Sequence, residues 1–74
     1  YRHYRVVRMV RKGQRMLKQM FDELVQHPDM LPARYLERAR QSSTHRTVCD
    51  YLAGMTDRFA QEEYIRLFHP TPAP

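Results

Sequence analysis

Apolar residues recur along the first third of the chain with the period of an α-helix. One arc of a 3.6-residue wheel holds Val6, Val10, Gly13, Leu17, Met20, Phe21 and Leu24. The opposite arc holds Arg8, Arg11, Lys12, Arg15 and Lys18. This pattern predicts an amphipathic helix over residues 2–27, ended by Pro28. Gly13 lies within the apolar arc, where we expect it to let another helix approach closely.

A connector follows this helix and contains two prolines. Pro28 and Pro32 predict a turn, and Pro32 suits the start of a short helix over residues 33–40. Ser43 or Thr44 is then placed to cap a further helix.

The apolar stripe of the C-terminal region changes direction part-way along. Its first half is Val48, Leu52, Met55 and Phe59. Its second half, Tyr64, Leu67 and Phe68, falls on a different side. A break at residues 54–56 accounts for the change, so we expect helices over 45–55 and 56–68 and a tail over 69–74. Thr56 is then a candidate N-cap, with Asp57 near the positive end of the helix dipole.

These elements predict an all-α fold in a single unit over residues 1–74. We expect a long antiparallel helical hairpin, a short connecting helix and a kinked or broken C-terminal helix. A chain of 74 residues buries only about 60% of the surface that its unfolded state exposes. Its core is therefore expected to be small, or to be completed by another part of a protein.

Composition adds three expectations. The chain starts with tyrosine inside a helical pattern, which indicates a piece of a longer protein, whereas the proline-rich PTPAP indicates a true C-terminus. Cys49 is the only cysteine, so no intrachain disulfide forms, and a reducing, cytoplasmic location is expected. No apolar run approaches the roughly 20 residues of a membrane helix.

The net charge of +5 is unevenly distributed. Residues 1–20 hold seven Lys/Arg and no acid, whereas residues 21–74 hold six Lys/Arg and eight acids. Such asymmetry is found in proteins that bind nucleic acid or another polyanion. The simpler interpretation is a solvated helix face, or a surface that meets an acidic part of the same protein.

Catalytic and metal-binding patterns are absent from the sequence. The four histidines have no metal-ligand spacing such as HExxH, and there is no glycine-rich phosphate loop or activated nucleophile. His27 and His69 each precede a proline at a predicted helix end, where an imidazolium suits the helix dipole. The residues therefore predict no catalytic group and no metal site within this chain.

Asp50 and Asp57 allow two interpretations. They are seven residues apart, so an unbroken helix would place both carboxylates on one face, where a pair can perform acid–base chemistry. The favoured alternative gives each a local structural task. Asp57 then lies in the first turn of a helix, and Asp50 pairs with an arginine such as Arg46.

The segment CDYLAGMTDRFAQEEYIRLF resembles the C-terminal signature of the deoxyguanosinetriphosphate triphosphohydrolases, within the HD-domain phosphohydrolases. The family pattern is close to V-C-D-Y-I-A-G-M-T-D-R-F/Y-A, from which only Leu52 departs by replacing isoleucine. The opening YRHYRVVRM also resembles the family's Y-x-H-x-x-V segment. The resemblance spans nearly all of the chain.

This resemblance implies a parent enzyme that hydrolyses a deoxynucleoside triphosphate to the deoxynucleoside and tripolyphosphate. Such enzymes hold a divalent metal, Mn or Mg, with a His…His-Asp…Asp set on an all-helical core. Those ligands are not in this sequence and would lie upstream. The chain is then expected to be inactive alone, to serve as scaffold or in oligomerisation, and to partner the upstream HD catalytic domain and further copies of itself.

The resemblance also implies roles for individual residues. Tyr1 matches the tyrosine that lies near the nucleotide pocket in this family. The stretch GMTDRFA is expected to form a helix–helix corner, in which Gly54 permits the bend or a close contact. Phe59 would fill the core, and Arg58 would reach an acid on the rest of the parent. The basic first helix is expected to serve an interface, an effector nucleotide or nucleic acid.

An alternative function is a small basic helical module that binds nucleic acid. It draws on the charge of the first twenty residues and on a helix-turn-helix near the connector. Against it, no predicted helix carries a recognition cluster of Arg, Asn and Gln, and Glu62 and Glu63 make the last helix acidic.

Overall fold

The computed structural model describes residues 3–69, and in the first helix it describes the side chains of Arg8 and of Val10 onward. These residues form α1 (His3–Gln26), the short 3-10 turn η1 (Pro28–Met30), α2 (Ala33–Gln41), α3 (Thr44–Ala53) and α4 (Asp57–Phe68). No strand occurs among them, so the prediction of an all-α fold is confirmed. The observed helix ends differ from the predicted ones by no more than two residues, which is the usual uncertainty of a helix boundary.

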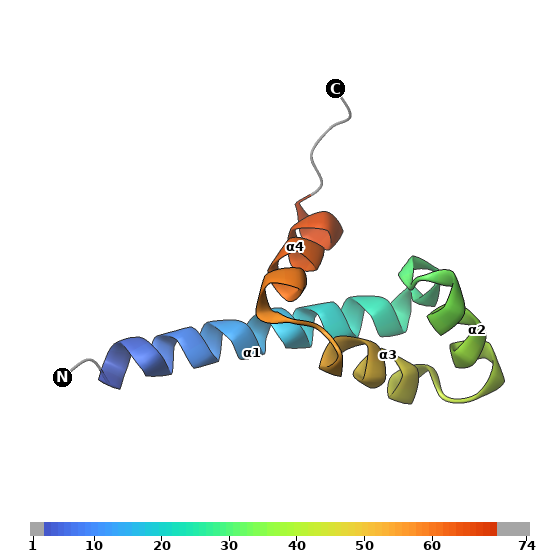
Figure 1. Ribbon diagram of the computed structural model, residues 1–74, viewed down its shortest axis with the longest axis horizontal. Coiled ribbons are helices and arrows are strands. Elements are labelled where there is room, and N and C mark those ends of the chain that lie inside the picture. Colours follow the sequence, from blue (N-terminus) through green and yellow to red (C-terminus); the bar gives the residue numbers. More distant parts are fainter. Residues whose placement is uncertain (1–2, 70–74) are drawn as a thin grey trace, which may run out of the picture.

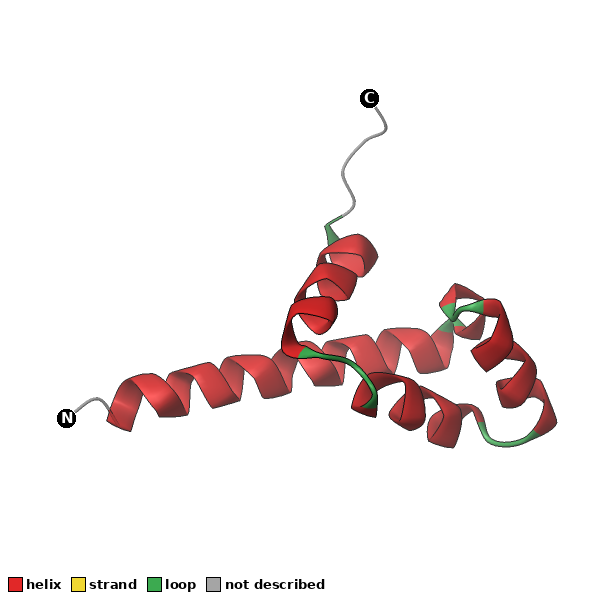
Figure 2. Cartoon of the chain, in the orientation of Figure 1, coloured by secondary structure: helices red, strands yellow, loops and turns green. Residues whose placement is uncertain are grey.

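The helices are arranged around one long rod. α1 runs along the length of the molecule, and α3 returns antiparallel to it beside its C-terminal half (Figure 1). α2 closes the end of this hairpin, and α4 begins beside the middle of α1, which it contacts, and projects away from it (Figure 2). The hairpin therefore has one long and one short arm, because the expected second long helix is divided into α3 and α4.

Local chemistry explains where these helices begin and end. Pro28 follows α1, and Pro32 occupies the N-cap of α2 with the fixed φ of −54°. Ser43 caps α3, where its hydroxyl accepts a 3.2 Å hydrogen bond from the Arg46 N–H. The sequence predicted Ser43 or Thr44 as this cap, and Ser43 is the one observed.

The hydrophobic core is small and lies at one end of the molecule. It forms where the C-terminal half of α1 meets η1, α2 and α3. Its buried members are Leu24, Leu31, Ala39, Val48 and Tyr51. Met20 is also fully buried, whereas Val10 and Leu17 are 53% and 43% exposed. The N-terminal half of α1, which we call the free arm (residues 3–18), therefore extends beyond the core, and Val10 and Leu17 on its apolar side are left exposed.

Two sequence expectations about packing are wrong for this part of the chain. A Cβ placed on Gly13 would meet nothing within 4 Å, so no helix approaches it closely. Phe59 is 41% exposed and does not fill the core. Both residues lie in apolar stripes that periodicity detected correctly, but the described helices leave these sections of the stripes unpacked.

Candidate functional site

The corner between α3 and α4 is the feature that the sequence marked most strongly. α3 ends as the Gly54 N–H donates a 3.2 Å hydrogen bond to the Asp50 carbonyl. The backbone is then extended at Thr56, with ψ of 161°, and α4 begins at the next residue. The Thr56 hydroxyl accepts a 3.1 Å hydrogen bond from the Phe59 N–H, so it is the N-cap that its position predicted. Asp57 follows in the first turn, where its charge favours the helix dipole.

Gly54 occupies an ordinary backbone conformation in this corner. Its φ is −84° and its ψ is −1°, values that any L-residue adopts. A Cβ there would lie 3.6 Å from the Asp50 carbonyl oxygen and 3.8 Å from that of Tyr51, which is normal van der Waals contact. The bend therefore does not depend on glycine within the described residues, and the expected close contact at Gly54 is not found among them.

A hydrogen bond between side chains sets α4 against α3. The Tyr51 hydroxyl donates to Glu63 Oε2 at 2.9 Å, and Arg66 Nη2 lies 3.5 Å from the same oxygen. Burial, with the adjacent Glu63 carboxylate as the next cause, raises the pKa of Tyr51 from 10.0 to about 12. Tyr51 thus remains a neutral hydrogen-bond donor at physiological pH.

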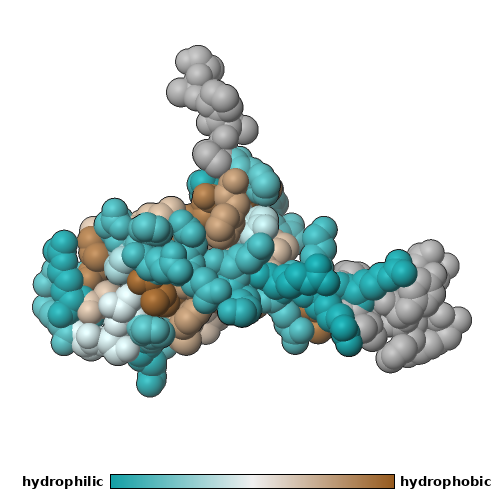
Figure 3. Space-filling model, turned by 180° about the vertical axis from the view of Figure 1, so that it is seen from behind, coloured by the Kyte–Doolittle hydropathy of each residue, from teal (hydrophilic) through white to brown (hydrophobic). Residues whose placement is uncertain are grey.

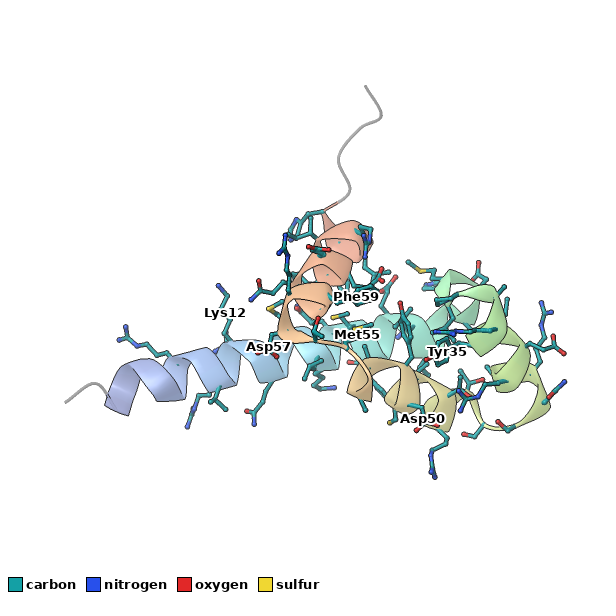
Figure 4. The ribbon with its side chains drawn as sticks, viewed as in Figure 1. Lys12, Tyr35, Asp50, Met55, Asp57 and Phe59 are labelled. Atoms are coloured by element: carbon teal, nitrogen blue, oxygen red, sulfur yellow. The ribbon has the colours of Figure 1, made fainter. Side chains whose placement is uncertain are left out.

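Asp50 connects α3 to α2. Its Oδ2 accepts a 3.2 Å hydrogen bond from Arg38 Nη2, and its Oδ1 one of 3.4 Å from Arg46 Nε. The pairing with Arg46 was predicted from the four-residue spacing, whereas the contact with Arg38 depends on how α2 packs. Asp50 and Asp57 lie on different helices on either side of the break (Figure 4), so the structure does not bring them together as a catalytic pair.

An aromatic recess of about 290 Å³ lies between the corner and α2. Its lining residues are Pro32, Arg34, Tyr35, Tyr51, Gly54, Met55, Thr56 and Phe59. The rings of Tyr35 and Tyr51 are 4.9 Å apart, and the guanidinium groups of Arg34 and Arg38 lie 5.1 and 5.4 Å from the Tyr35 ring centre. These cation–π contacts hold the rim of the recess in place. Figure 4 shows Met55 and Phe59 close together, with Tyr35 beyond them toward α2.

Sequence reasoning missed two members of this arrangement, Tyr35 as a wall of the recess and Glu63 as the partner of Tyr51. Glu63 lies twelve residues from Tyr51 across a helix break, so no spacing within one helix could indicate the pair. Tyr35 lies in the predicted short helix over residues 33–40, to which no site was assigned. An aromatic residue next to two arginines on one face is the signal that could have indicated its surroundings.

The other residues singled out in the sequence have simpler positions. Arg58 is 90% exposed at its side chain and pairs with Glu62 at 3.2 Å, and its expected acid outside the chain stays a prediction. Tyr1 lies outside the described residues. The described residues contain no group of three or more His, Cys, Asp or Glu side chains that could hold a metal ion. None of their helices is both long and apolar enough to cross a membrane.

A second hollow lies between the free arm and the corner. It measures about 510 Å³ and brings Val10, Gly13 and Leu17 of α1 next to Leu52 and Met55 at the end of α3. We call it the apolar groove. Figure 3, which views the molecule from behind, shows hydrophobic side chains in separate patches between hydrophilic ones, both on the hairpin and on α4.

The basic side of the free arm is turned away from this groove. Arg8, Arg11, Lys12 and Arg15 are all exposed, and Lys18 is 76% exposed at its side chain. Figure 3 shows strongly hydrophilic side chains over this stretch of α1 on the face in view, and Figure 4 shows Lys12 pointing out from the helix.

Comparison with known families decides what this helical arrangement belongs to. Residues 1–66 match the family described as the phosphohydrolase-associated domain, which covers most of the chain and all helices up to the last turn of α4. The chain belongs to this family.

Individual relatives of this phosphohydrolase-associated domain are much longer proteins. A deoxyguanosinetriphosphate triphosphohydrolase-like protein of Geobacter metallireducens is 53% identical over 70 residues, which are 95% of this chain and 18% of the relative. The similarly named protein of Geobacter sulfurreducens is 50% identical over 70 residues, and that of Bordetella pertussis is 47% identical over 68. The chain thus spans about a fifth of the length of these relatives. No solved structure matches it.

Proposed function

We propose that this chain is the C-terminal helical region of a deoxynucleoside triphosphate triphosphohydrolase of the dGTP type. The whole enzyme would hydrolyse its substrate to a deoxynucleoside and tripolyphosphate. The observation that carries the proposal is the 53% identity over 95% of the chain to a relative named for this activity. The helical corner formed by CDYLAGMTDRFA, with its Thr56 cap and Tyr51–Glu63 contact, supports a packing role for this region.

The role proposed for the chain itself is to support the catalytic part and not to perform chemistry. Its described residues offer no donor set that fits the divalent ion, Mn or Mg, expected in the whole enzyme. No step of the reaction is therefore assigned to them. Enzymes of this kind are expected to be cytoplasmic homo-oligomers, and the chain supplies surfaces for both intramolecular and intermolecular contact.

The apolar groove is the surface that we assign to the phosphohydrolase part of the longer protein. Val10 and Leu17 are large apolar side chains left 53% and 43% exposed, and Gly13 between them has free space above it. Burying one such side chain stabilises a protein by roughly 1.5–3 kcal/mol. A longer protein, of which this chain is about 18%, has ample surface to cover the groove. The argument favours an intramolecular occupant over a second copy.

The test of the activity is tripolyphosphate release from dGTP and the other deoxynucleoside triphosphates, with manganese or magnesium, by the full-length protein. The 74-residue chain is assayed in parallel as the negative control. Release by the full-length protein alone supports the proposal. Release of orthophosphate or pyrophosphate instead, or no turnover of any deoxynucleotide, contradicts it.

The test of the groove uses Leu17→Glu in the full-length protein, with Gln26→Glu as the control. Both changes add one negative charge to α1, but Gln26 is exposed at the end of the helix and outside the groove. We expect Leu17→Glu to lower the midpoint of thermal unfolding and the activity, because it places a charge in a buried interface. Equal midpoints for the two variants would show that the groove faces solvent.

A further inference from the structure

We propose that the aromatic recess between the corner and α2 binds an aromatic side chain, with an Asp or Glu carboxylate next to it, from the phosphohydrolase part of the longer protein. Met55 and Thr56 border both this recess and the apolar groove, but the groove extends from them toward the free arm and the recess toward α2. The inference rests on the proposed function only in that the chain is one part of such a protein. It adds a second contact site and the chemistry of the group that fills it.

The recess has the size and the walls to accept a ring. Its volume of about 290 Å³ is nearly twice that of an apolar cavity of roughly 150 Å³, which is large enough for benzene. Tyr35, Tyr51 and Phe59 supply aromatic walls, and Met55 supplies a thioether. Aromatic rings pack favourably against other rings and against the sulfur of methionine. An aromatic side chain therefore fits these walls better than a polar one.

Phe59 is the wall that an occupant would cover most. Its ring is 41% exposed in the described chain, although it belongs to the apolar stripe of the corner. Figure 4 shows Phe59 beside Met55, with Tyr35 on the α2 side of the recess that all three line. Removing apolar surface from water is the main favourable contribution to protein association, so this exposed ring favours an occupied recess.

One cation without an acidic partner lies at the rim of the recess. The guanidinium of Arg34 is 5.1 Å from the Tyr35 ring centre, and Arg34 forms no ion pair within residues 3–69. Arg38 lies 5.4 Å from the same ring centre, but Asp50 neutralises it at 3.2 Å. Arginine binds a carboxylate in a strong and oriented contact. The group that complements Arg34 is therefore a carboxylate next to the ring that enters the recess.

The occupant is assigned to the same longer protein because most of that protein lies outside this chain. The match that covers 95% of this chain covers only 18% of the Geobacter metallireducens relative. The family that residues 1–66 match is described as associated with a phosphohydrolase. The phosphohydrolase part thus provides both the surface and the proximity that filling the recess requires.

A second copy of this chain is a poorer occupant. Within residues 3–69 an aromatic residue adjoins an acid at three places, which are Phe21-Asp22, Asp50-Tyr51 and Glu63-Tyr64. In each pair the acid already has a partner in its own chain: Asp22 binds Lys18, Asp50 binds Arg38, and Glu63 binds Tyr51. No described pair is therefore free to enter the recess of another copy.

The experiment is hydroxyl-radical footprinting of the full-length protein, in which mass spectrometry measures the oxidation rate of each side chain. Arg34→Glu reverses the charge at the rim. Arg40→Glu is the control, because Arg40 is also exposed on α2 and without an acidic partner among the described residues, but does not line the recess. We expect Phe59 to be protected in the wild type and to oxidise roughly fivefold faster in Arg34→Glu, because like charges expel the occupant. Arg40→Glu should leave the Phe59 rate unchanged.

The same data identify the occupant. Side chains whose oxidation rises together with that of Phe59 in Arg34→Glu should lie outside this chain and include an aromatic residue next to Asp or Glu. Changing that acid to Lys in the Arg34→Glu protein should restore the protection of Phe59. Val48 is fully buried, so its oxidation reports general unfolding. If Arg34→Glu exposes Val48, the comparison is made with Arg34→Gln, which removes the charge without reversing it and should change the Phe59 rate in the same direction.

Three outcomes overturn the proposal. The first is a wild-type Phe59 that oxidises as fast as the 51% exposed Ile65, after correction for the intrinsic reactivity of each residue type. The second is an equal Phe59 rate in the Arg34 and Arg40 variants. The third is newly oxidised residues that all lie within this chain, which would assign the recess to a second copy. Footprinting does not require turnover, and tripolyphosphate release is measured in parallel, so failure of the recess is distinguished from failure of the proposed hydrolysis.

Discussion

The hydroxyl of Tyr51 on α3 donates a 2.9 Å hydrogen bond to the Glu63 carboxylate on α4. These residues lie on either side of the helix break, so their contact sets how α4 departs from α3. The Glu63 side chain is only 17% exposed, and Arg66 on the next turn adds a second contact to the same oxygen. The corner is therefore held by side chains from both helices as well as by its backbone.

Tyr51→Phe is expected to destabilise the protein by about 1.5 kcal/mol. The change keeps the ring in the core but leaves the half-buried Glu63 carboxylate without its neutral donor, and hydrogen bonds to charged groups contribute about 1.5–3 kcal/mol. Urea unfolding of the two proteins measures the difference. Tyr64→Phe is the control, because its hydrogen bond to Gln19 is exposed and should contribute less. Equal losses of stability for the two changes would mean that the Tyr51–Glu63 hydrogen bond contributes no more than the exposed Tyr64–Gln19 one.

The same tyrosine predicts a loss of stability at alkaline pH. Its pKa is raised from 10.0 to about 12 in the folded chain, so the folded state holds the phenol proton more tightly than the unfolded state does. That stabilisation is complete below pH 10 and is lost as the pH rises from about 10 to about 12. Across this pH range, the midpoint of thermal unfolding should fall more steeply with pH for the wild type than for Tyr51→Phe. Equal slopes of the midpoint against pH for the two proteins would contradict a raised pKa for Tyr51.

Thr56→Ala is expected to cost about 1 kcal/mol of stability. It removes the hydroxyl that accepts the 3.1 Å hydrogen bond from the Phe59 N–H and so leaves a backbone donor of α4 without its cap. Thr56→Ser keeps the oxygen and should retain most of the wild-type stability. Chemical denaturation distinguishes the two variants, and an equal cost for both would show that the methyl group, not the cap, matters.

Arg46→Ala and Arg38→Ala are expected to have small effects of about 0.5 kcal/mol or less. Both arginines pair with Asp50, but their side chains are 80% and 54% exposed and Asp50 itself is 40% exposed, so solvent screens the pairs. A double-mutant cycle with Asp50→Asn measures each coupling at low and high salt. Coupling of several kcal/mol, or coupling that does not weaken with salt, would contradict this view.

Gly54→Ala is expected to leave the stability of this helical region unchanged or to raise it by about 0.4–1 kcal/mol. The φ of −84° suits alanine, the new Cβ meets only ordinary contacts, and alanine reduces the entropy of the unfolded chain. Unfolding and triphosphohydrolase activity of the full-length protein are measured together. If stability is unchanged but activity is lost, Gly54 is required for a contact with a part of the protein outside this chain. A large loss of stability would contradict the corner geometry.

Local features of the sequence predicted the elements well, because they depend on near neighbours. The 3.6-residue period identified α1, and Pro28 and Pro32 predicted the turn that follows it. Thr56 was recognised as a cap from position and chemistry alone, and Ser43 was one of two candidates with Thr44. The pairing of Asp50 with Arg46 followed from a four-residue spacing. The segment CDYLAGMTDRFA indicated the family that residues 1–66 match.

The sequence by itself determined which residues form helices, where those helices end and which side of each helix is apolar. Periodicity and caps are properties of a single helix, so they can be recognised without the rest of the fold. Only the tertiary structure decided which apolar positions are buried. Val10, Leu17 and Phe59 have the same pattern as Leu24 and Val48, but the described helices cover only the latter two. The pairing of Tyr51 with Glu63 and of Asp50 with Arg38 likewise required the angles between helices, which depend on contacts between residues far apart in the chain.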